Sequence, residues 1–297
     1  MIDGVEAGFI VRRRAPPDLP GAFAIAFAWL AASHPALARA GQRTAAAMDA
    51  AATGGATPPE PAYHNRHHAA EATLAMGLLC RHGVTQGCID ARHAAIGIAA
   101  MVGHDMGHDG SQTRGGVLER RSRDAAAALA AAAGVLPADL ALLGDVILGT
   151  DPDQVAGNAA RHAGRLPPGP LGPAQDALRV LANEADVCAS LLPTLGPRLG
   201  LLLAQEWGAD TPAGRLARTA TGRLAFLRAY PCPAFPAMSG PARTLGLDAA
   251  RLRGITAYAA AGHPFGAATT PEAGAAALDR MPPDAAAAAY AAALVRG

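Results

Sequence analysis

The sequence predicts an all-α protein, and three observations support that prediction. Much of its 51% of hydrophobic residues is alanine, the strongest helix former. Aromatic residues make up only 4% of the chain, whereas strands favour aromatic and β-branched residues. Helical patterns separated by Gly- and Pro-rich segments recur, and no segment shows a convincing strand pattern. With 297 residues, the chain can bury a core and a deep pocket.

The expected elements follow one another along what we take to be a single domain, residues 1–297. An irregular lead-in is expected up to Leu19. Helices are then expected at about 21–52, 63–82, 91–104, 118–134, 137–150, 174–192, 198–207 and 213–230. Loops are expected at 108–116, which holds three glycines, and at the Pro- and Gly-rich stretch 166–173. The candidate catalytic and metal-binding motifs lie between about residues 60 and 230.

Charge and cysteine usage narrow the class of protein. A formal net charge of +1 offers no basic excess for nucleic acid. No apolar run is long enough for a membrane span, and the N-terminus lacks a signal-peptide pattern. The four cysteines, Cys80, Cys88, Cys188 and Cys232, form no Cys-x-x-Cys pair. We therefore expect a cytoplasmic protein with reduced thiols and a small-molecule substrate, and leave open whether it is a homodimer.

Three short segments carry the residues suited to chemistry. The first is Tyr63-His64-Asn65-Arg66-His67-His68-Ala69, the second is Gly103-His104-Asp105-Met106-Gly107-His108, and the third is Asn183-Glu184-Ala185-Asp186. Five of the ten histidines fall in the first two segments. This concentration makes a shared site more plausible than a scatter of surface histidines.

The spacing within these segments predicts a binuclear metal site. His64 and His68 are four residues apart and share one helix face, which His67 does not. His104 and Asp105 supply a nitrogen and an oxygen ligand, and Asp186 can arrive from a later helix. Imidazole and carboxylate groups bind the same divalent ions, and a carboxylate can bridge two of them. Water held by such a pair has a lowered pKa, so hydroxide forms at neutral pH.

At these residues the sequence resembles the class I cyclic-nucleotide phosphodiesterases, within the HD-domain metal phosphohydrolase superfamily. The His-Asn-x-x-His signature of the family matches residues 64–68, and His-Asp-x-x-His matches residues 104–108. The Val-Leu-Glu segment resembles residues 117–119, Leu-x-Thr-Asp resembles 148–151, and Ala-Asp resembles 185–186. The matches keep the family's order over about residues 63–205.

The resemblance implies a compact multi-helix bundle with a central binuclear pocket. It assigns His68, His104, Asp105 and Asp186 to the first metal, usually Zn²⁺, with Asp105 bridging to Mg²⁺ or Mn²⁺; iron is a further option. It implies that His64 is the general acid and that His108 and Glu119 orient metal-bound water. We expect Tyr63, Asn65 and Phe226 to bind substrate. The implied reaction opens a 3′,5′-cyclic nucleotide, cAMP or cGMP, to its 5′-monophosphate by attack of hydroxide held between two metals.

Departures from the family pattern keep other functions open. Arg120-Arg121-Ser122 stands where the family has Asn-His-His, and the best local alignment puts Leu224 at the purine-binding glutamine. A broad-specificity or non-cyclic phosphodiester or phosphonate ester hydrolase is therefore the alternative. A di-iron oxygenase needs additional histidines between the His-Asp pair and Asp186; after His108 only His162 stands there, in an expected loop. A catalytically silent binding module is the remaining alternative.

Overall fold

The computed structural model describes residues 1–54, 59–230, 238–262 and 270–296. The described residues contain helices and no strands, which confirms the predicted all-α class. The helices are α1 (Ile2–Arg12), α2 (Leu19–Phe27), α3 (Pro35–Thr53), α4 (Arg66–Thr85), α5 (Ala91–Met101), α6 (Val117–Ala132), α7 (Pro137–Leu148), α8 (Val155–His162), α9 (Pro173–Asp186), α10 (Cys188–Leu191), α11 (Gly196–Trp207), α12 (Pro212–Arg218), α13 (Ala220–Ala229), α14 (Gly240–Leu245), α15 (Leu247–Gly262), α16 (Pro271–Leu278) and α17 (Pro283–Arg296).

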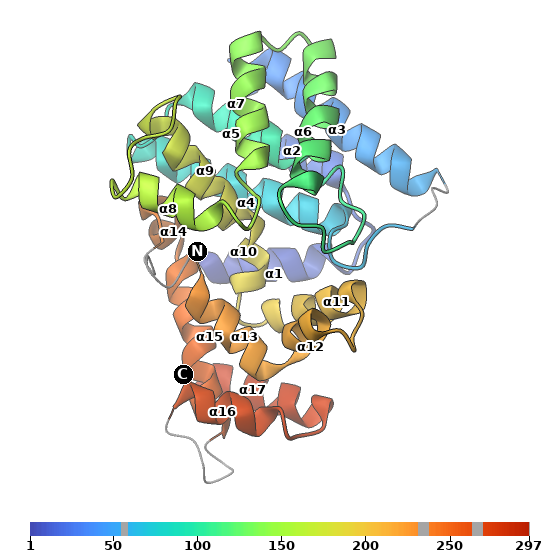
Figure 1. Ribbon diagram of the computed structural model, residues 1–297, viewed down its shortest axis with the longest axis vertical. Helices are drawn as coiled ribbons and strands as arrows, with labels where there is room; N and C mark the ends of the chain where they lie inside the picture. Colours follow the sequence, from blue (N-terminus) through green and yellow to red (C-terminus); the bar gives the residue numbers. More distant parts are fainter. Residues whose placement is uncertain (55–58, 231–237, 263–269, 297) are drawn as a thin grey trace.

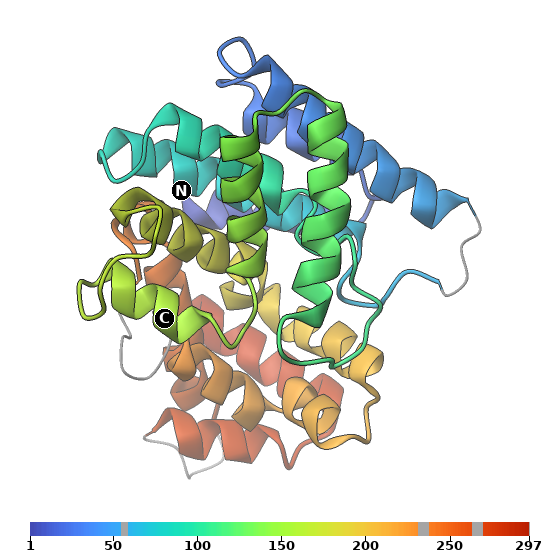
Figure 2. The same cartoon turned by 45° about the horizontal axis from the view of Figure 1, so that its top comes forward.

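The helices form two groups. In Figure 1, α2–α9 fill the upper part of the molecule, whereas α11–α13 and α15–α17 fill the lower part. Helices α1 and α10 lie between the groups. The green helices α6 and α7 run side by side at one face, as both views show (Figures 1 and 2). In the described part of the chain, no helix is both long and apolar enough to span a bilayer.

Helix α4 is the centre of the upper group, in contact with α2, α5, α9 and α14. Small side chains let these helices approach closely. Gly97 on α5 is an example, because a Cβ there would lie 2.5 Å from Cε of Met76 on α4 and 2.7 Å from Cδ1 of Leu178 on α9. A larger residue there would force the side chains of Met76 and Leu178, or the helices that carry them, to shift. The close packing matters because α4, α5 and α9 carry or precede the predicted metal ligands.

Several expected element boundaries are wrong, for reasons visible in the sequence. The expected helix 21–52 is two helices, because Pro35 starts α3 and disfavours helical geometry at His34, whose φ is −131° and ψ 60°. The expected helix 213–230 breaks at Thr219, which has an extended backbone and caps α13 with its hydroxyl. The expected helix 174–192 ends at Asp186, before the short α10. His162 belongs to the last turn of α8 and not to a loop.

The expected irregular lead-in is also wrong, since residues 2–12 form α1. Two glycines, Gly4 and Gly8, weaken its helix propensity. Tertiary contacts compensate for that weakness. The buried Glu6 accepts hydrogen bonds from the N–H groups of Thr194 (2.7 Å) and Leu195 (2.8 Å), ahead of α11. A local sequence pattern does not predict this helix, because Thr194 and Leu195, which stabilise it, lie far along the chain.

The end of α1 is tied to α4 by a buried ion pair. Arg13 donates from Nε and Nη2 to the two carboxylate oxygens of Glu71, at 2.6 and 2.8 Å. The Glu71 side chain is only 2% exposed, and burial raises its pKa in spite of Arg13.

Three thiols in the described residues, Cys80, Cys88 and Cys188, are free. Cys232 lies outside those residues.

We expect Arg13→Met to destabilise the protein by roughly 3–5 kcal/mol, because it leaves the buried Glu71 carboxylate without a partner. The double variant Arg13→Met/Glu71→Leu should recover most of that loss, since no charge is then buried. Urea unfolding followed by circular dichroism measures both free energies. A double variant no more stable than Arg13→Met would show that the pair itself stabilises the fold.

Candidate active site

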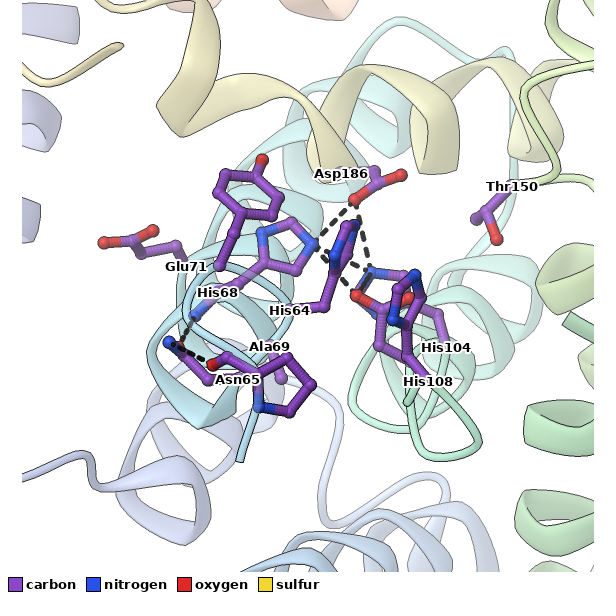
Figure 3. Close-up of polar contacts among 12 residues, drawn as sticks. His64, Asn65, His68, Ala69, Glu71, His104, His108, Thr150 and Asp186 are labelled. Carbon is purple, nitrogen blue, oxygen red and sulfur yellow. Dashed lines mark hydrogen bonds and ion pairs between the residues drawn. The ribbon is translucent and has the colours of Figure 1, made fainter. Parts of the chain in front are cut away.

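Four side chains from distant parts of the sequence meet at one point between α4, α5 and α9 (Figure 3). His68 Nε2 lies 2.9 Å from Asp186 Oδ1 and 3.2 Å from Asp105 Oδ2. His104 Nε2 lies 3.2 Å from the same Asp186 oxygen and 3.3 Å from the same Asp105 oxygen. The two imidazole nitrogens are 3.3 Å apart. The structure thus brings together the four residues predicted to bind the first metal.

This arrangement fits a divalent cation. Zn²⁺ binds histidine nitrogen and carboxylate oxygen at about 2.0–2.2 Å, so its tetrahedral ligand atoms lie about 3.3–3.5 Å apart. The five separations that involve an imidazole nitrogen, 2.9–3.3 Å, come close to that value. Oδ2 of Asp105 is buried and has no hydrogen-bond partner among the described residues. A cation would satisfy this oxygen and both inward-facing nitrogens at once.

The first of the predicted ligands, His68, is placed by the start of α4. The side chain of Asn65 caps this helix, because its Oδ1 accepts from the N–H groups of His67 (3.0 Å) and His68 (3.2 Å). Its amide nitrogen donates to the carbonyl of Ala62 at 2.8 Å. The cap therefore fixes both the first turn of α4 and the segment that precedes it.

His104 and Asp105 lie in the turn that follows α5. Nδ1 of His104 is 2.8 Å from the carbonyl oxygen of Met101, so Nδ1 carries the proton and donates it. Nε2 is then the nitrogen with the free lone pair, as a metal ligand requires. His104 is 1% exposed, and so is the side chain of His68. Both histidines are therefore withdrawn from solvent.

Asp186 ends α9, and its two predecessors in the sequence motif hold that helix. Asn183 donates to the carbonyl of Gly149 at 2.7 Å and accepts from Asn158 at 3.0 Å. The buried Glu184 accepts from the N–H (2.6 Å) and hydroxyl (2.5 Å) of Ser239. Burial raises the pKa of Glu184 to about 7. The motif therefore supplies one inward-facing ligand and two structural contacts.

Electrostatics at the four-residue cluster favour bound positive charge. Burial alone would raise the pKa of Asp105 and Asp186, yet His68 and His104 hold both pKa values below the usual range. Burial alone would lower the pKa of the two histidines. At His68, however, Tyr63 and the two carboxylates outweigh burial and raise the pKa. At His104, Asp105 and Asp186 likewise raise the pKa. The carboxylates are thus ionised at neutral pH, and the positive charge that they stabilise is carried by the two imidazoles.

A second cluster, formed by His64, His108 and Glu206, adjoins the first. Nδ1 of His64 is 2.5 Å from Oε1 of Glu206, while Oε2 of Glu206 accepts from the backbone N–H groups of Tyr63 (2.7 Å) and His64 (3.0 Å). The rings of His64 and His108 are stacked, with centroids 3.7 Å apart and planes 15° from parallel. Figure 3 shows the two rings beside the His104–Asp186 contacts.

The geometry of this second cluster does not suit a metal. Histidine binds metals through lone pairs in the plane of its ring, and stacked rings point their lone pairs along nearly parallel lines. A separation of 2.5 Å between His64 Nδ1 and Glu206 Oε1 is a direct hydrogen bond. Nδ1 of His108 is also used, because it accepts from the N–H of Gly110 at 3.0 Å. In this cluster, Glu206 therefore holds His64 by a hydrogen bond and His108 packs against the face of its ring.

Glu206 is the functional candidate that sequence reasoning missed. It lies 142 residues from His64 and belongs to no motif that we identified. Its pKa is lowered, because the hydrogen bond and charge of His64 and the two backbone donors outweigh burial. The one available signal was weak: Glu206 is an acidic residue at the end of the mostly apolar α11, where a partner is expected.

The other predicted site residues occupy different places. Tyr63 is buried, with its hydroxyl 2.8 Å from Ser190 Oγ and its ring against His64 and His68. Asn65 uses its side chain for the helix cap described above. That these two residues bind substrate stays a prediction, since the contacts seen hold the histidine segment in place.

Glu119 and Phe226 were also predicted from the resemblance. Glu119 lies half-buried in the first turn of α6, where burial and then the charges of Asp151, Asp105 and Asp186 raise its pKa. It is thus close to the four-residue cluster. Phe226 lies on α13, with the guanidinium carbon of Arg223 5.4 Å from its ring centroid and the ring of Tyr230 at 6.1 Å. These described contacts do not involve either histidine cluster.

Comparisons with known proteins give one informative result. No protein-family model matches the sequence, and no curated protein sequence matches it. The structure is similar to that of the phosphodiesterase domain of the RhoPDE fusion protein from the choanoflagellate Salpingoeca rosetta, with a TM-score of 0.56. The match covers 95% of this chain and 92% of that chain, at 14% sequence identity.

The chain has a phosphodiesterase-like fold. This confirms the multi-helix bundle that the sequence resemblance implied. At such low identity a shared fold does not establish a shared activity. The side chains of the site are therefore what can indicate the function.

Proposed function

We propose that this protein is a metal-dependent phosphodiesterase. The observation that carries the proposal is the convergence of His68 and His104 with Asp105 and Asp186, in which each carboxylate lies within 3.3 Å of both imidazoles, beside a separate His64–Glu206 pair. The first set supplies the donors for a cation, and the second offers a proton. Hydrolysis of a phosphodiester with a poor leaving group is accelerated by both.

The donor set matches the proposed metals. Two imidazoles and two carboxylates suit Zn²⁺ in the first site, and Asp105 has a second oxygen that could bridge to Mg²⁺ or Mn²⁺, whose remaining ligands would be water. When bound, such cations supply hydroxide at neutral pH and offset the charge of the phosphate. Glu119, whose pKa the charges of Asp105 and Asp186 raise, is the acid that we assign to orienting water.

His64 is the residue that we assign to protonating the leaving oxygen. Its Nδ1 is held by Glu206, so Nε2 is the nitrogen left to face the substrate. The side chain is 17% exposed, in contrast to the buried metal-ligand histidines. A leaving alkoxide needs a proton as the bond to phosphorus breaks, and histidine delivers protons near neutral pH.

Glu206→Gln should slow hydrolysis by roughly tenfold to a thousandfold, part of what proton transfer usually contributes. An amide cannot accept from all three donors that Glu206 now serves, so the His64 ring would lose its fixed tautomer and position. The rate can be measured with phenyl methyl phosphate and metal content by mass spectrometry. Glu272→Gln, in an exposed pair with Arg228, is the control. A Glu206→Gln enzyme as fast as the wild type would contradict the role.

The preferred substrate that we propose is a 3′,5′-cyclic nucleotide, hydrolysed to the 5′-monophosphate. A broader or non-cyclic diester, or a phosphonate ester, is the second candidate. It is favoured by Leu224, which is 3% exposed and offers no polar atom to a purine. The oxygenase alternative is less favoured, because the clusters of potential metal ligands in the described residues do not include His162.

The test of the proposed function is hydrolysis of bis(4-nitrophenyl) phosphate by protein loaded with Zn²⁺ and Mg²⁺ or Mn²⁺. We expect activity that a chelator abolishes and added metal restores. A panel of cAMP, cGMP, 2′,3′-cyclic nucleotides and phosphonate monoesters then separates the two candidates. Metal-loaded protein that cleaves no ester in the panel would refute the proposal. Oxygen consumption by iron-loaded protein would point to the oxygenase instead.

A further inference from the structure

The orientation of the His64 ring is only partly set by Glu206. A hydrogen bond from Nδ1 fixes the position of one ring atom, but hydrogen bonds tolerate a broad range of angles. The ring plane could therefore tilt about the Nδ1–Glu206 line. Because Nε2 delivers its proton within the ring plane, such a tilt moves the proton away from the leaving oxygen. Something besides Glu206 has to hold the plane.

His108 covers one face of the His64 ring. A centroid separation of 3.7 Å and an angle of 15° describe face-to-face contact over the whole ring. Tyr63 meets the same ring only by an edge, at 4.7 Å and 79°. Of these two contacts, a parallel face restrains tilting more than an edge does, because any tilt drives ring atoms together.

His108 is itself held in place. Its Nδ1 accepts from the N–H of Gly110 at 3.0 Å, and the N–H of the preceding Gly107 donates to the Ser122 hydroxyl on α6 at 2.9 Å. A Cβ on Gly107 would lie 2.8 Å from the Ser122 nitrogen, so this loop sits directly on α6. The loop that carries the His108 ring is therefore attached to α6, a long helix outside the four-residue cluster.

We propose that His108 is a positioning residue that acts through the face of its ring, holding the plane of His64 so that Nε2 points at the leaving oxygen. The proposal rests on the proposed hydrolase function and replaces, for His108, the orientation of metal-bound water that the sequence resemblance implies. The two roles differ in the part of the side chain that matters. Stacking needs an aromatic face, whereas orienting water needs a polar nitrogen.

The two roles can be separated with His108→Phe and His108→Gln. Phenylalanine keeps the aromatic face and removes the nitrogens, whereas glutamine keeps an N–H near the Nε2 position and removes the face. The substrates are 4-nitrophenyl methyl phosphate and phenyl methyl phosphate, which share the scissile bond. Only the phenyl ester depends strongly on protonation of its leaving group.

If His108 acts by stacking, we expect the kcat of His108→Phe on the phenyl ester to stay within about threefold of the wild-type value, because an aromatic pair is preserved. His108→Gln should lose about tenfold to a hundredfold on that ester, as for a catalytic group misplaced by about 1 Å. Both variants should cleave the 4-nitrophenyl ester at nearly the wild-type rate with unchanged KM. The control is His93→Phe, on a partly buried histidine that pairs with Asp90 at the start of α5.

Two outcomes would overturn the positioning role. One is a His108→Gln enzyme faster than His108→Phe on the phenyl ester. The other is an equal loss on both esters in both variants, as expected if His108 serves the attacking water. Zinc content and thermal melting establish that each variant is folded, and His108→Tyr replaces His108→Phe if the latter is not. Wild-type protein that cleaves neither ester would refute the hydrolase function itself, a result distinct from both.

Discussion

Asp105→Asn is expected to lower hydrolysis of every phosphodiester by about a thousandfold or more, since the bound cations contribute several kcal/mol to the transition state. Asp105 offers one oxygen to the histidine pair, at 3.2 and 3.3 Å, and has another for a second ion. The asparagine amide carries no charge and has only one oxygen, so both ions should bind poorly. Metal content per chain, measured by mass spectrometry after dialysis, should fall together with activity.

A matched control lies four residues further along the same loop. Asp109 is exposed, pairs with Arg121 at 3.1 Å and contacts neither cluster. Asp109→Asn makes the same chemical change and should leave metal content and rate close to those of the wild type. An Asp105→Asn protein that keeps two ions per chain would show that the four-residue cluster is not the metal site.

His64→Ala should produce a different pattern, in which metal is retained and the loss depends on the leaving group. We expect a decrease of about a hundredfold to ten-thousandfold on phenyl methyl phosphate, the usual contribution of a proton-transfer group. The decrease on 4-nitrophenyl methyl phosphate should be much smaller, because nitrophenolate leaves without a proton. Steady-state rates on the two esters give the ratio directly.

His67→Ala is the control for His64→Ala. His67 is on the same stretch of chain, and the described contacts do not join it to either histidine cluster. If His64→Ala slows both esters equally, His64 is not the general acid. If it also removes metal, then His64 belongs to the metal site and the separation of the two clusters is wrong.

The sequence predicted those parts of the site that have local spacing. His64 and His68 one turn apart, and the adjacent His104 and Asp105, place donors on short, rigid pieces of backbone. Asp186 was found because the resemblance kept its order along the chain. Their convergence depends on close contacts such as Gly97 against Met76 and Leu178, which only tertiary packing determines.

Other features left little trace in the local sequence. Glu206 meets His64 across 142 residues, and Glu6 meets Thr194 across 188. Neither partner lies in a motif, so neither pairing could be foreseen. The break before Pro35 is a different kind of error, because proline is a strong sign of a helix start. It was obscured by the long apolar pattern that continues on both sides of it.

The position of Glu206 has a further consequence for the stability of activity. The proposed metal donors come from α4, α9 and the turn after α5 in the upper group, whereas Glu206 comes from α11 in the lower group (Figure 1). Cation binding and proton delivery therefore depend on different parts of one chain. Under mild denaturation that loosens α11 first, the protein would still be able to take up metal after it had lost fast cleavage of alkyl esters. Metal content alone would then be a poor measure of intact enzyme.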